Sequence, residues 1–291
     1  MSLCTRFGLG TFVVTGEVGP PKGASAQETL EGARVMAPCV DAVNVTDNQS
    51  AVMRLGSLAV ASLLKQEGID PVFQITCRDR NRIALQSDLL SAAALGVENI
   101  LVLSGDHMVL GDHPTAKGVF DLDSVQLLTA ATGLANGSDL EGHKLDSKPT
   151  FCLGAVVNPG SDDLDAQLLK MRKKINAGAH FFQTQAVYEV DVFANFAERA
   201  NKLGVPIMAG VVPLKSAGMA RYMNDNVAGV HVPQDMVERI GKAKKADRKK
   251  VSAEMAAEFI RQVKDLCQGI HLMPLGWDDL VPEIVSQSQI R

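Results

Sequence analysis

The sequence predicts an α/β protein in which residues 1–291 form one domain, a (β/α)8 TIM barrel. Three observations predict it: eight short apolar runs recur along the 291 residues, helical patterns separate them, and glycines close several of these helices. Strands buried on both faces of a parallel sheet have nearly continuous apolar runs, which is the pattern seen here. The same alternation also fits a doubly wound open sheet, which is the second architecture we consider.

The expected strands are runs rich in Val, Ile, Phe and Thr. In chain order they cover residues 11–17, 41–46, 71–77, 99–104, 151–157, 181–185, 205–213 and 269–275. Because crossovers between parallel strands are right-handed, the intervening helices would form a ring outside a closed barrel of these strands.

The clearest helical pattern covers residues 162–178. Its apolar positions Leu164, Leu168, Met171 and Ile175 are four, three and four residues apart, so they form one stripe on a solvated helix. A glycine at the end of a helix allows the left-handed turn that leads into the next strand. We expect this role for Gly68, Gly96, Gly178, Gly204 and Gly269.

Three other segments need an interpretation. Residues 105–121 and 133–149 are rich in turn-forming residues, and we expect long loops or a helical insertion there. A helix is expected over 247–268, and the Lys-rich stretch 242–250 is most simply its solvated start. Docking of an acidic ligand or partner is the alternative for these lysines.

The composition is that of an ordinary globular protein, with 46% hydrophobic and 21% charged residues. A net charge of -4 argues against a nucleic-acid partner, because a nucleic-acid surface has a basic excess. The chain has no apolar run of membrane-spanning length and no secretory signal at its start. We therefore expect a cytoplasmic protein with no membrane partner.

The cysteines and histidines lie far apart and form no closely spaced ligand pair. Neither a disulfide framework nor a zinc site is indicated, so we expect buried free thiols and no metal site. The five cysteines are Cys4, Cys39, Cys77, Cys152 and Cys267.

The strand ends carry candidate site residues, because chemistry in a (β/α)8 barrel collects at the C-terminal ends of its strands. Glu17 closes the first apolar run, and the stiff segment Val18-Gly19-Pro20-Pro21-Lys22 would hold its carboxyl group at the barrel mouth. Burial raises the pKa of a carboxyl group toward the range of a general acid that works near neutrality. The alternative is a carboxylate paired with a nearby Lys or Arg.

Asp106 and several amides and hydroxyls follow other strands. Asp106 comes after the run 99–104 and Gly105, which allows a turn or a close approach to a ligand; helix capping is the alternative for Asp106. Amides and hydroxyls gathered at one rim suit a flat, hydrogen-bonding ligand, although each could also be a satisfied core group. The polar residues at these strand ends are Thr46, Gln74, Thr76, Gln183, Thr184 and Gln185, together with the carboxyl group of Asp47 and the thiol of Cys77.

Motifs of several common enzyme classes are absent. No GxGxxG follows a strand, and the sequence has no P-loop, no GxSxG and no HExxH. The residues thus predict a barrel enzyme whose rim carries carboxylates and amides.

In this order and spacing, several short motifs resemble the flavin-dependent methylenetetrahydrofolate reductases, and the resemblance spans nearly the whole chain. The motifs are Gly16-Glu17 with Pro20-Pro21-Lys22, Val45-Thr46, Ile75-Thr76-Cys77, Leu103-Ser104-Gly105-Asp106, the segment 168–179, Thr184-Gln185 and Gly210-Val211-Val212-Pro213. Residues 77–82 and 113–123 are most similar to the branch found in one-carbon pathways of anaerobes, including acetogens.

The resemblance implies a role for each matching residue. Glu17 would be the general acid that opens the five-membered ring of methylenetetrahydrofolate, after which hydride from N5 of the reduced flavin gives 5-methyltetrahydrofolate. Thr46 matches the position near flavin N5, and Lys174 matches a lysine near the flavin phosphate. Asp106 would lie between flavin and pterin, as both a catalytic and a binding residue, and Gln185 would hydrogen-bond the pterin.

The sequence departs from the family at three flavin-contacting places. Gln74 replaces a His that many members have, Ser104 replaces an Arg, and Val156-Val157-Asn158-Pro159 replaces a Tyr-Pro-Glu type of loop. The family implies FAD, and these departures make FMN an alternative. Ala217 stands where the family has a pocket aromatic, which puts direct use of NAD(P)H in doubt.

The partners implied are the folate, an electron donor and an oligomeric assembly. The donor would be NAD(P)H or a separate cysteine-rich or iron–sulfur subunit, since this chain has no cysteine spacing for a cluster of its own. A pterin-binding barrel methyltransferase without flavin is the rival enzyme class. A scaffold subunit whose partner carries the chemistry is a third hypothesis, although a retired site would not need Glu17 and Asp106.

Overall fold

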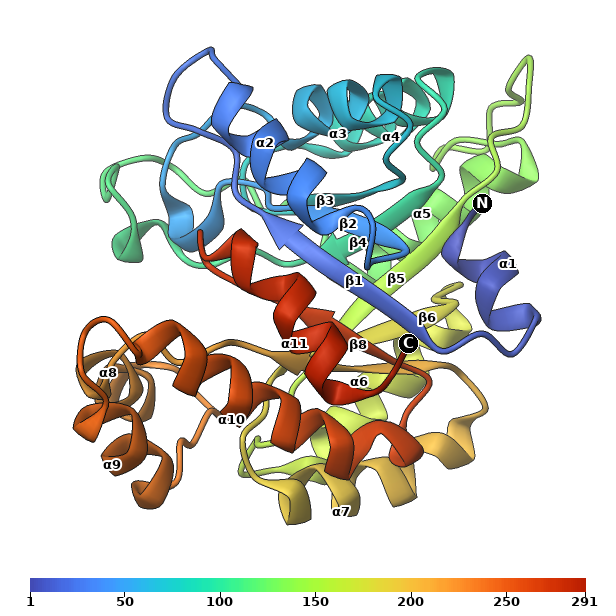
Figure 1. Ribbon diagram of the computed structural model, residues 1–291. Coiled ribbons are helices and arrows are strands. Elements are labelled where there is room, and N and C mark those ends of the chain that lie inside the picture. Colours follow the sequence, from blue (N-terminus) through green and yellow to red (C-terminus); the bar gives the residue numbers. More distant parts are fainter.

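Eight parallel strands close into a barrel in the computed structural model, which describes residues 1–291 (Figure 1). Each strand pairs with the next along the chain, and the last pairs with the first. The strands are β1 (Val13–Val18), β2 (Ala42–Val45), β3 (Pro71–Thr76), β4 (Asn99–Leu103), β5 (Cys152–Val157), β6 (Phe181–Ala186), β7 (Ile207–Val211) and β8 (Gly269–Leu272). The predicted (β/α)8 barrel is confirmed, and the open sheet is not formed.

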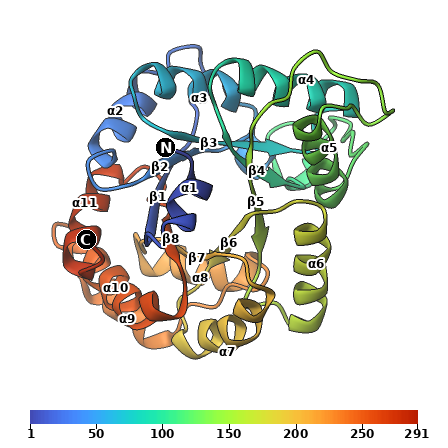
Figure 2. The ribbon, with the colours of Figure 1, turned by 90° about the vertical axis from the view of Figure 1, so that its right-hand side faces the viewer.

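The helices form a ring outside the barrel, with one exception at its end. They are α1 (Leu3–Gly8), α2 (Gln27–Met36), α3 (Ser57–Gln66), α4 (Arg82–Ala94), α5 (Ser124–Asn136), α6 (Leu164–Asn176), α7 (Val190–Ala200), α8 (Ala217–Asn226), α9 (Gln234–Lys242), α10 (Arg248–Val263) and α11 (Val281–Ser288). Figure 2 shows the ring in a view along the barrel, with α1 near the centre, over the strands. No helix in residues 1–291 has the length and apolar character of a membrane span.

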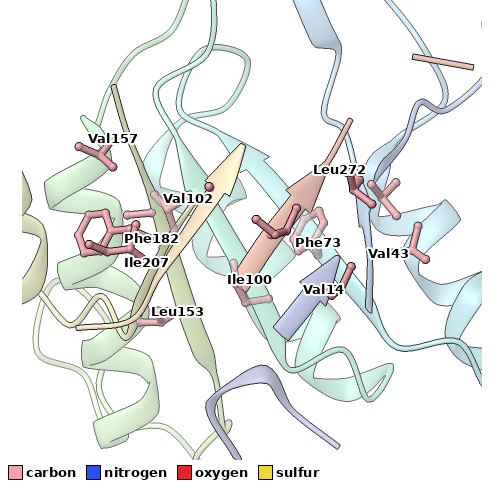
Figure 3. Packing of buried hydrophobic residues seen from close by; sticks show 14 of the residues in the cluster. Val14, Val43, Phe73, Ile100, Val102, Leu153, Val157, Phe182, Ile207 and Leu272 are labelled. Carbon is pink, nitrogen blue, oxygen red and sulfur yellow. The ribbon is translucent and has the colours of Figure 1, made fainter. Parts of the chain in front are cut away.

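Side chains along each strand point alternately outward, toward the helices, and inward, toward the barrel axis, so the barrel has an outer and an inner apolar core. Outward-facing residues such as Val14, Phe73 and Phe182 pack under the helices in the larger core (Figure 3). Inward-facing residues form a smaller apolar layer at the end of the barrel where the strands begin, and α1 closes that end. Leu3 of α1 is fully buried there, and its backbone N–H donates to Oδ1 of Asn99 at 2.8 Å.

Four of the five glycines expected to close helices have the left-handed backbone that this role requires. Their φ angles are 79° at Gly68, 74° at Gly96, 109° at Gly178 and 72° at Gly204. The prediction for Gly269 is wrong, because it is the first residue of β8 and its φ is not left-handed. A Cβ at Gly269 would lie 2.3 Å from the carbonyl oxygen of Val13. Only a glycine therefore allows β8 to approach β1 this closely.

The cysteine prediction is partly wrong. Cys4 of α1 and Cys152 of β5 form a disulfide that ties the N-terminal helix to the barrel across 148 residues of sequence. Cys39, Cys77 and Cys267 are free, as expected. Burial raises the pKa of the Cys77 thiol to about 12 and that of Cys267 to about 11, so both stay protonated.

The two long segments contain little regular structure. Residues 105–121 form a loop with one short 3₁₀ turn at Met108–Leu110. Of the segment 133–149, the first residues end α5 and the rest is a loop with a single bridge between Ser138 and Lys144. The lysine-rich stretch 242–250 joins α9 to α10, and α10 covers most of the helix expected over 247–268.

Candidate active site

A cavity of about 680 Å³ opens at the C-terminal ends of the strands. Polar residues from strands β1, β3, β6 and β8, from the loops after β2 and β4 and from helix α6 line it. All seven residues predicted from the sequence for the site lie on its wall: Glu17, Thr46, Gln74, Ser104, Asp106, Lys174 and Gln185. The structure thus brings together side chains that are up to 168 residues apart in the sequence.

Glu17 projects from β1 into the base of the cavity and is 8% exposed. Its Oε2 accepts a hydrogen bond from Nε2 of Gln74 at 2.9 Å and lies 3.3 Å from Nε2 of His271. No Lys or Arg pairs with it, so the alternative interpretation of Glu17, a carboxylate neutralised by a nearby cation, does not hold. Glu17 is thus a buried carboxyl group that faces the cavity and has an amide and an imidazole beside it.

On the side of Glu17 toward the start of the strands lies a layer of buried polar side chains, and the sequence did not predict that they contact one another. His271 on β8 contacts Oγ1 of Thr15 through Nδ1 at 2.9 Å, and Gln183 on β6 donates to the same oxygen at 3.3 Å. Gln183 also pairs with Asn44 on β2. His271 had one sequence signal, a polar residue at the centre of an apolar run, two positions after Gly269.

Thr46 follows β2 and is 3% exposed, yet its Oγ1 has no hydrogen-bond partner in the protein. Buried hydroxyl groups are nearly always satisfied, so an unpaired one on a cavity wall points to a ligand atom as its partner. The next residue, Asp47, is instead fully engaged. It accepts from the backbone N–H and Oγ1 of Thr76 and pairs with Arg80 at 2.7 Å, which makes it structural.

Asp106 and Ser104 lie on the turn after β4, and both are exposed to the cavity. Oδ2 of Asp106 accepts from the backbone N–H of Ser50 at 3.1 Å, so Asp106 joins two loops and caps no helix. Gly105 has a φ of 90°, and a Cβ there would lie 3.0 Å from Cβ of Arg78. The predicted glycine turn is confirmed, and the backbone here packs closely against Arg78.

Arg78 was not recognised in the sequence as part of the site. It is 1% exposed, and its guanidinium donates to the backbone oxygens of Asp106 at 3.3 Å and Asn48 at 3.1 Å while it pairs with Asp79. The loop that it holds is strained, because Asn48, Ser50 and Ala51 all have left-handed φ angles of 45° to 57°. Strained segments of this kind often lie at ligand sites.

Lys174 on α6 supplies a half-buried cation to the wall of the cavity. Its Nζ donates to the backbone oxygen of Val156 at 2.7 Å. Burial lowers its pKa to about 8, and neighbouring Lys170 contributes in the same direction. Lys170 and Lys173 also line the cavity, and none of the three lysines forms an ion pair with a carboxylate. This wall of the cavity therefore suits an anionic group.

Two other predicted positions differ in their relation to the cavity. Gln185 is exposed on its wall, and its Oε1 accepts only from the backbone N–H of Ala186 at 3.1 Å, which leaves its amide N–H groups free for a ligand. Ala217 begins α8 and packs against a separate apolar cluster away from the cavity wall. No group of three His, Cys, Asp or Glu side chains is arranged to hold a metal ion.

Comparison with known sequences points to one family. The family described as "Methylenetetrahydrofolate reductase" matches residues 5–289. "Methylenetetrahydrofolate reductase 2" of Schizosaccharomyces pombe is 26% identical over 94% of this chain and 44% of its own length. "Probable methylenetetrahydrofolate reductase (NADPH)" of Caenorhabditis elegans is 24% identical over 82% of this chain and 35% of its own. The chain thus spans less than half the length of these two relatives.

A bacterial relative and a solved structure match over most of their own lengths. "5,10-methylenetetrahydrofolate reductase" of Escherichia coli is 23% identical over 87% of this chain and 82% of its own. The fold is also similar to the solved structure of an uncharacterized protein from Clostridium thermocellum, which binds two copies of 5-methyl-5,6,7,8-tetrahydrofolic acid. The two structures match over the full length of both chains, with a TM-score of 0.67 and 17% sequence identity. At this identity the structural likeness shows the fold alone.

Proposed function

Because this chain belongs to the methylenetetrahydrofolate reductase family, we propose that it reduces 5,10-methylenetetrahydrofolate to 5-methyltetrahydrofolate with a bound flavin. The observation that carries the proposal is Glu17, a buried carboxyl group at the base of a large polar cavity, with the amide of Gln74 and the imidazole of His271 beside it. The folate bound by the Clostridium thermocellum protein of the same fold supports this substrate class.

Glu17 is the general acid in this proposal. Its carboxyl group delivers a proton to the folate so that the five-membered ring opens and the methylene carbon becomes electrophilic. Gln74 and the layer below hold the carboxyl group in place, and the cavity above it gives the substrate access. Asp106, on the turn after β4, and Gln185 of β6 would bind the pterin through its ring nitrogens and oxygen.

The residues present fit a flavin. The unpartnered Oγ1 of Thr46 would bind its ring system, beside Gln74, Ser104 and Asp106, and the uncompensated charge of Lys174 would bind a phosphate. When bound, a reduced flavin supplies the hydride that reduces the methylene carbon. We propose FAD, as the family implies, with FMN as the alternative.

The electron donor in this proposal is NAD(P)H or a separate redox subunit. Ala217, at the position where the family has a stacking aromatic, begins α8 outside the cavity wall, so this chain offers no aromatic platform there for nicotinamide. That observation favours a donor that reduces the flavin without stacking at this position, such as a partner subunit within an oligomer.

One experiment tests substrate and cofactor together: the visible absorption spectrum of the purified protein before and after anaerobic addition of 5-methyltetrahydrofolate. This addition runs the reaction backward, so the bands of oxidised flavin should bleach. Bound flavin that does not bleach would contradict the folate assignment for the isolated chain. A colourless protein that takes up neither FAD nor FMN would rule out the reductase and favour the pterin-binding methyltransferase.

A further inference from the structure

The two carboxyl oxygens of Glu17 have different surroundings. Oε2 has two neighbours that can donate, Nε2 of Gln74 at 2.9 Å and Nε2 of His271 at 3.3 Å. Oε1 makes no hydrogen bond within the protein, while Glu17 forms part of the cavity wall. Which oxygen carries the acidic proton therefore depends on whether His271 donates or accepts.

The amide pair below His271 decides this. Nδ2 of Asn44 donates to Oε1 of Gln183 at 2.8 Å, and Nε2 of Gln183 donates back to Oδ1 of Asn44 at 3.2 Å. This pairing leaves the second N–H of Gln183, which is directed at Oγ1 of Thr15 at 3.3 Å. Thr15 is therefore an acceptor toward Gln183, and it keeps its own hydroxyl proton to donate.

The other neighbour of the Thr15 hydroxyl is Nδ1 of His271, at 2.9 Å. A hydroxyl that already accepts from Gln183 satisfies both groups best by donating to Nδ1. A neutral imidazole that accepts at Nδ1 has its proton on Nε2. That proton is directed at Oε2 of Glu17.

We propose that His271 is a neutral positioning residue: it donates from Nε2 to Oε2 of Glu17, beside Gln74, so that the proton used in catalysis is carried by Oε1. An oxygen that accepts from two donors has no room for a proton of its own, so Oε1 is left to protonate. The catalytic part of this inference rests on the proposed function, whereas the hydrogen-bond assignment does not.

The layer under His271 does not conduct protons to solvent. Beneath Thr15 and Gln183 lies the apolar layer that includes Val13, Phe181 and Met208, and α1 closes the barrel below it. None of these groups can carry a proton onward. Glu17 must therefore regain its proton from the cavity side, where Oε1 is free.

The first test reads the tautomer of His271 directly, by ¹⁵N NMR of the histidine-labelled holoenzyme near neutral pH, with His271→Gln to identify its signals. We expect a neutral ring with its proton on Nε2. Thr15→Ser keeps the hydroxyl and should keep this tautomer, whereas Thr15→Val should lose the preference. A proton on Nδ1, or an imidazolium in the wild-type protein, would overturn the assignment. This result does not depend on which substrate the enzyme uses.

The second test separates positioning from packing by comparing His271→Gln with His271→Asn. The Gln amide reaches the place of Nε2 and can still donate, whereas the Asn amide mimics Nδ1 only. We expect His271→Asn to slow folate reduction by the prereduced enzyme about tenfold, with folate half-saturation unchanged, and His271→Gln to recover most of that loss.

Equal rates in the two variants, whether normal or reduced, would show that the Nε2 contact is not what matters. A change in folate affinity with no change in rate would also contradict the proposal. If the wild-type enzyme reduces no methylenetetrahydrofolate, the proposed function fails, and the tautomer measurement still decides the assignment of His271.

Discussion

The two ends of the barrel differ in almost every physical respect. At the end where the strands begin, Leu3, Phe181 and their neighbours form an apolar layer, closed by α1 and the Cys4–Cys152 disulfide. At the other end, only six of the 28 residues around the cavity are hydrophobic, one buried hydroxyl lacks a partner, and the loop after β2 is strained. The first end is built for stability, and the second keeps groups free for a ligand.

The same strands build both ends, because inward-facing positions recur every second residue. Along β1, Val13 belongs to the apolar layer, Thr15 to the polar layer above it, and Glu17 to the cavity. Inward-facing residues of one strand that are only two positions apart thus belong to different layers, from the packed apolar layer to the wall of the cavity. Substitutions at the two ends should therefore separate stability from activity, and the following predictions test that separation.

The largest effect is expected at the cavity end. Glu17→Gln keeps the shape of the side chain and its contact with Gln74 but removes the acidic proton. We expect folate reduction to fall about 100-fold or more, with flavin content and the free energy of unfolding nearly unchanged. Single-turnover reaction of the reduced enzyme with methylenetetrahydrofolate measures this. A rate within about threefold of the wild type would remove Glu17 as the general acid.

The matching change at the closed end is Leu3→Ala. Leu3 is fully buried in the apolar layer, so its truncation leaves a cavity that should lower the free energy of unfolding by about 2–5 kcal/mol. Leu9→Ala is the control, because Leu9 lies just after the same helix and is 70% exposed. Denaturant titration gives both values. A loss of activity in folded Leu3→Ala would contradict the separation of the two ends.

The features that could be predicted from the sequence are the ones that depend on local pattern. The run 71–77 became β3 (Pro71–Thr76), and Gly178 closed its helix, because burial on both faces and a left-handed turn each leave a signal within a few residues. The positions of Glu17 and Asp106 followed from the strand ends alone, although the roles assigned to them came from the family resemblance.

Features that depend on distant partners were missed. The Cys4–Cys152 disulfide joins residues whose spacing matches no framework, and only the folded barrel brings α1 beneath β5. Arg78 and His271 are single polar residues in ordinary runs, and their importance comes from Asn48, Asp106 and Glu17 on other strands and loops. Contacts between strands far apart in the chain leave no local pattern from which to predict them.

The disulfide offers a smaller test of the closed end. Cys4→Ser frees α1 from β5 and relaxes a long loop in the unfolded chain, so the free energy of unfolding should fall by about 2–4 kcal/mol. Cys39→Ser, at a free and half-buried thiol, is the matched control. Added dithiol should lower the melting temperature of the wild type and leave Cys4→Ser unaffected. An equal response in both proteins would show that the disulfide does not stabilise the barrel.

The smallest effect concerns Lys174, whose burial in the cavity wall destabilises its charged form in the folded protein. Because burial lowers its pKa from 10.5 to about 8, the unfolded chain binds more protons than the folded one between these values. The free energy of unfolding should therefore rise with pH from about 8 toward 10.5, and Lys174→Met should remove this rise. Denaturant titrations below and above pH 8 measure it.

Ligand binding should follow the opposite trend, since the cationic form of Lys174 is the one that attracts an anion. FMN affinity is expected to fall as pH rises through about 8, and Lys174→Met should bind FMN about tenfold more weakly below that pH, with a flatter dependence. Lys173→Met, which removes an exposed lysine of the same wall, is the control. If the two variants lose affinity equally, the wall acts through its summed charge, and burial of Lys174 has no separate role in anion binding.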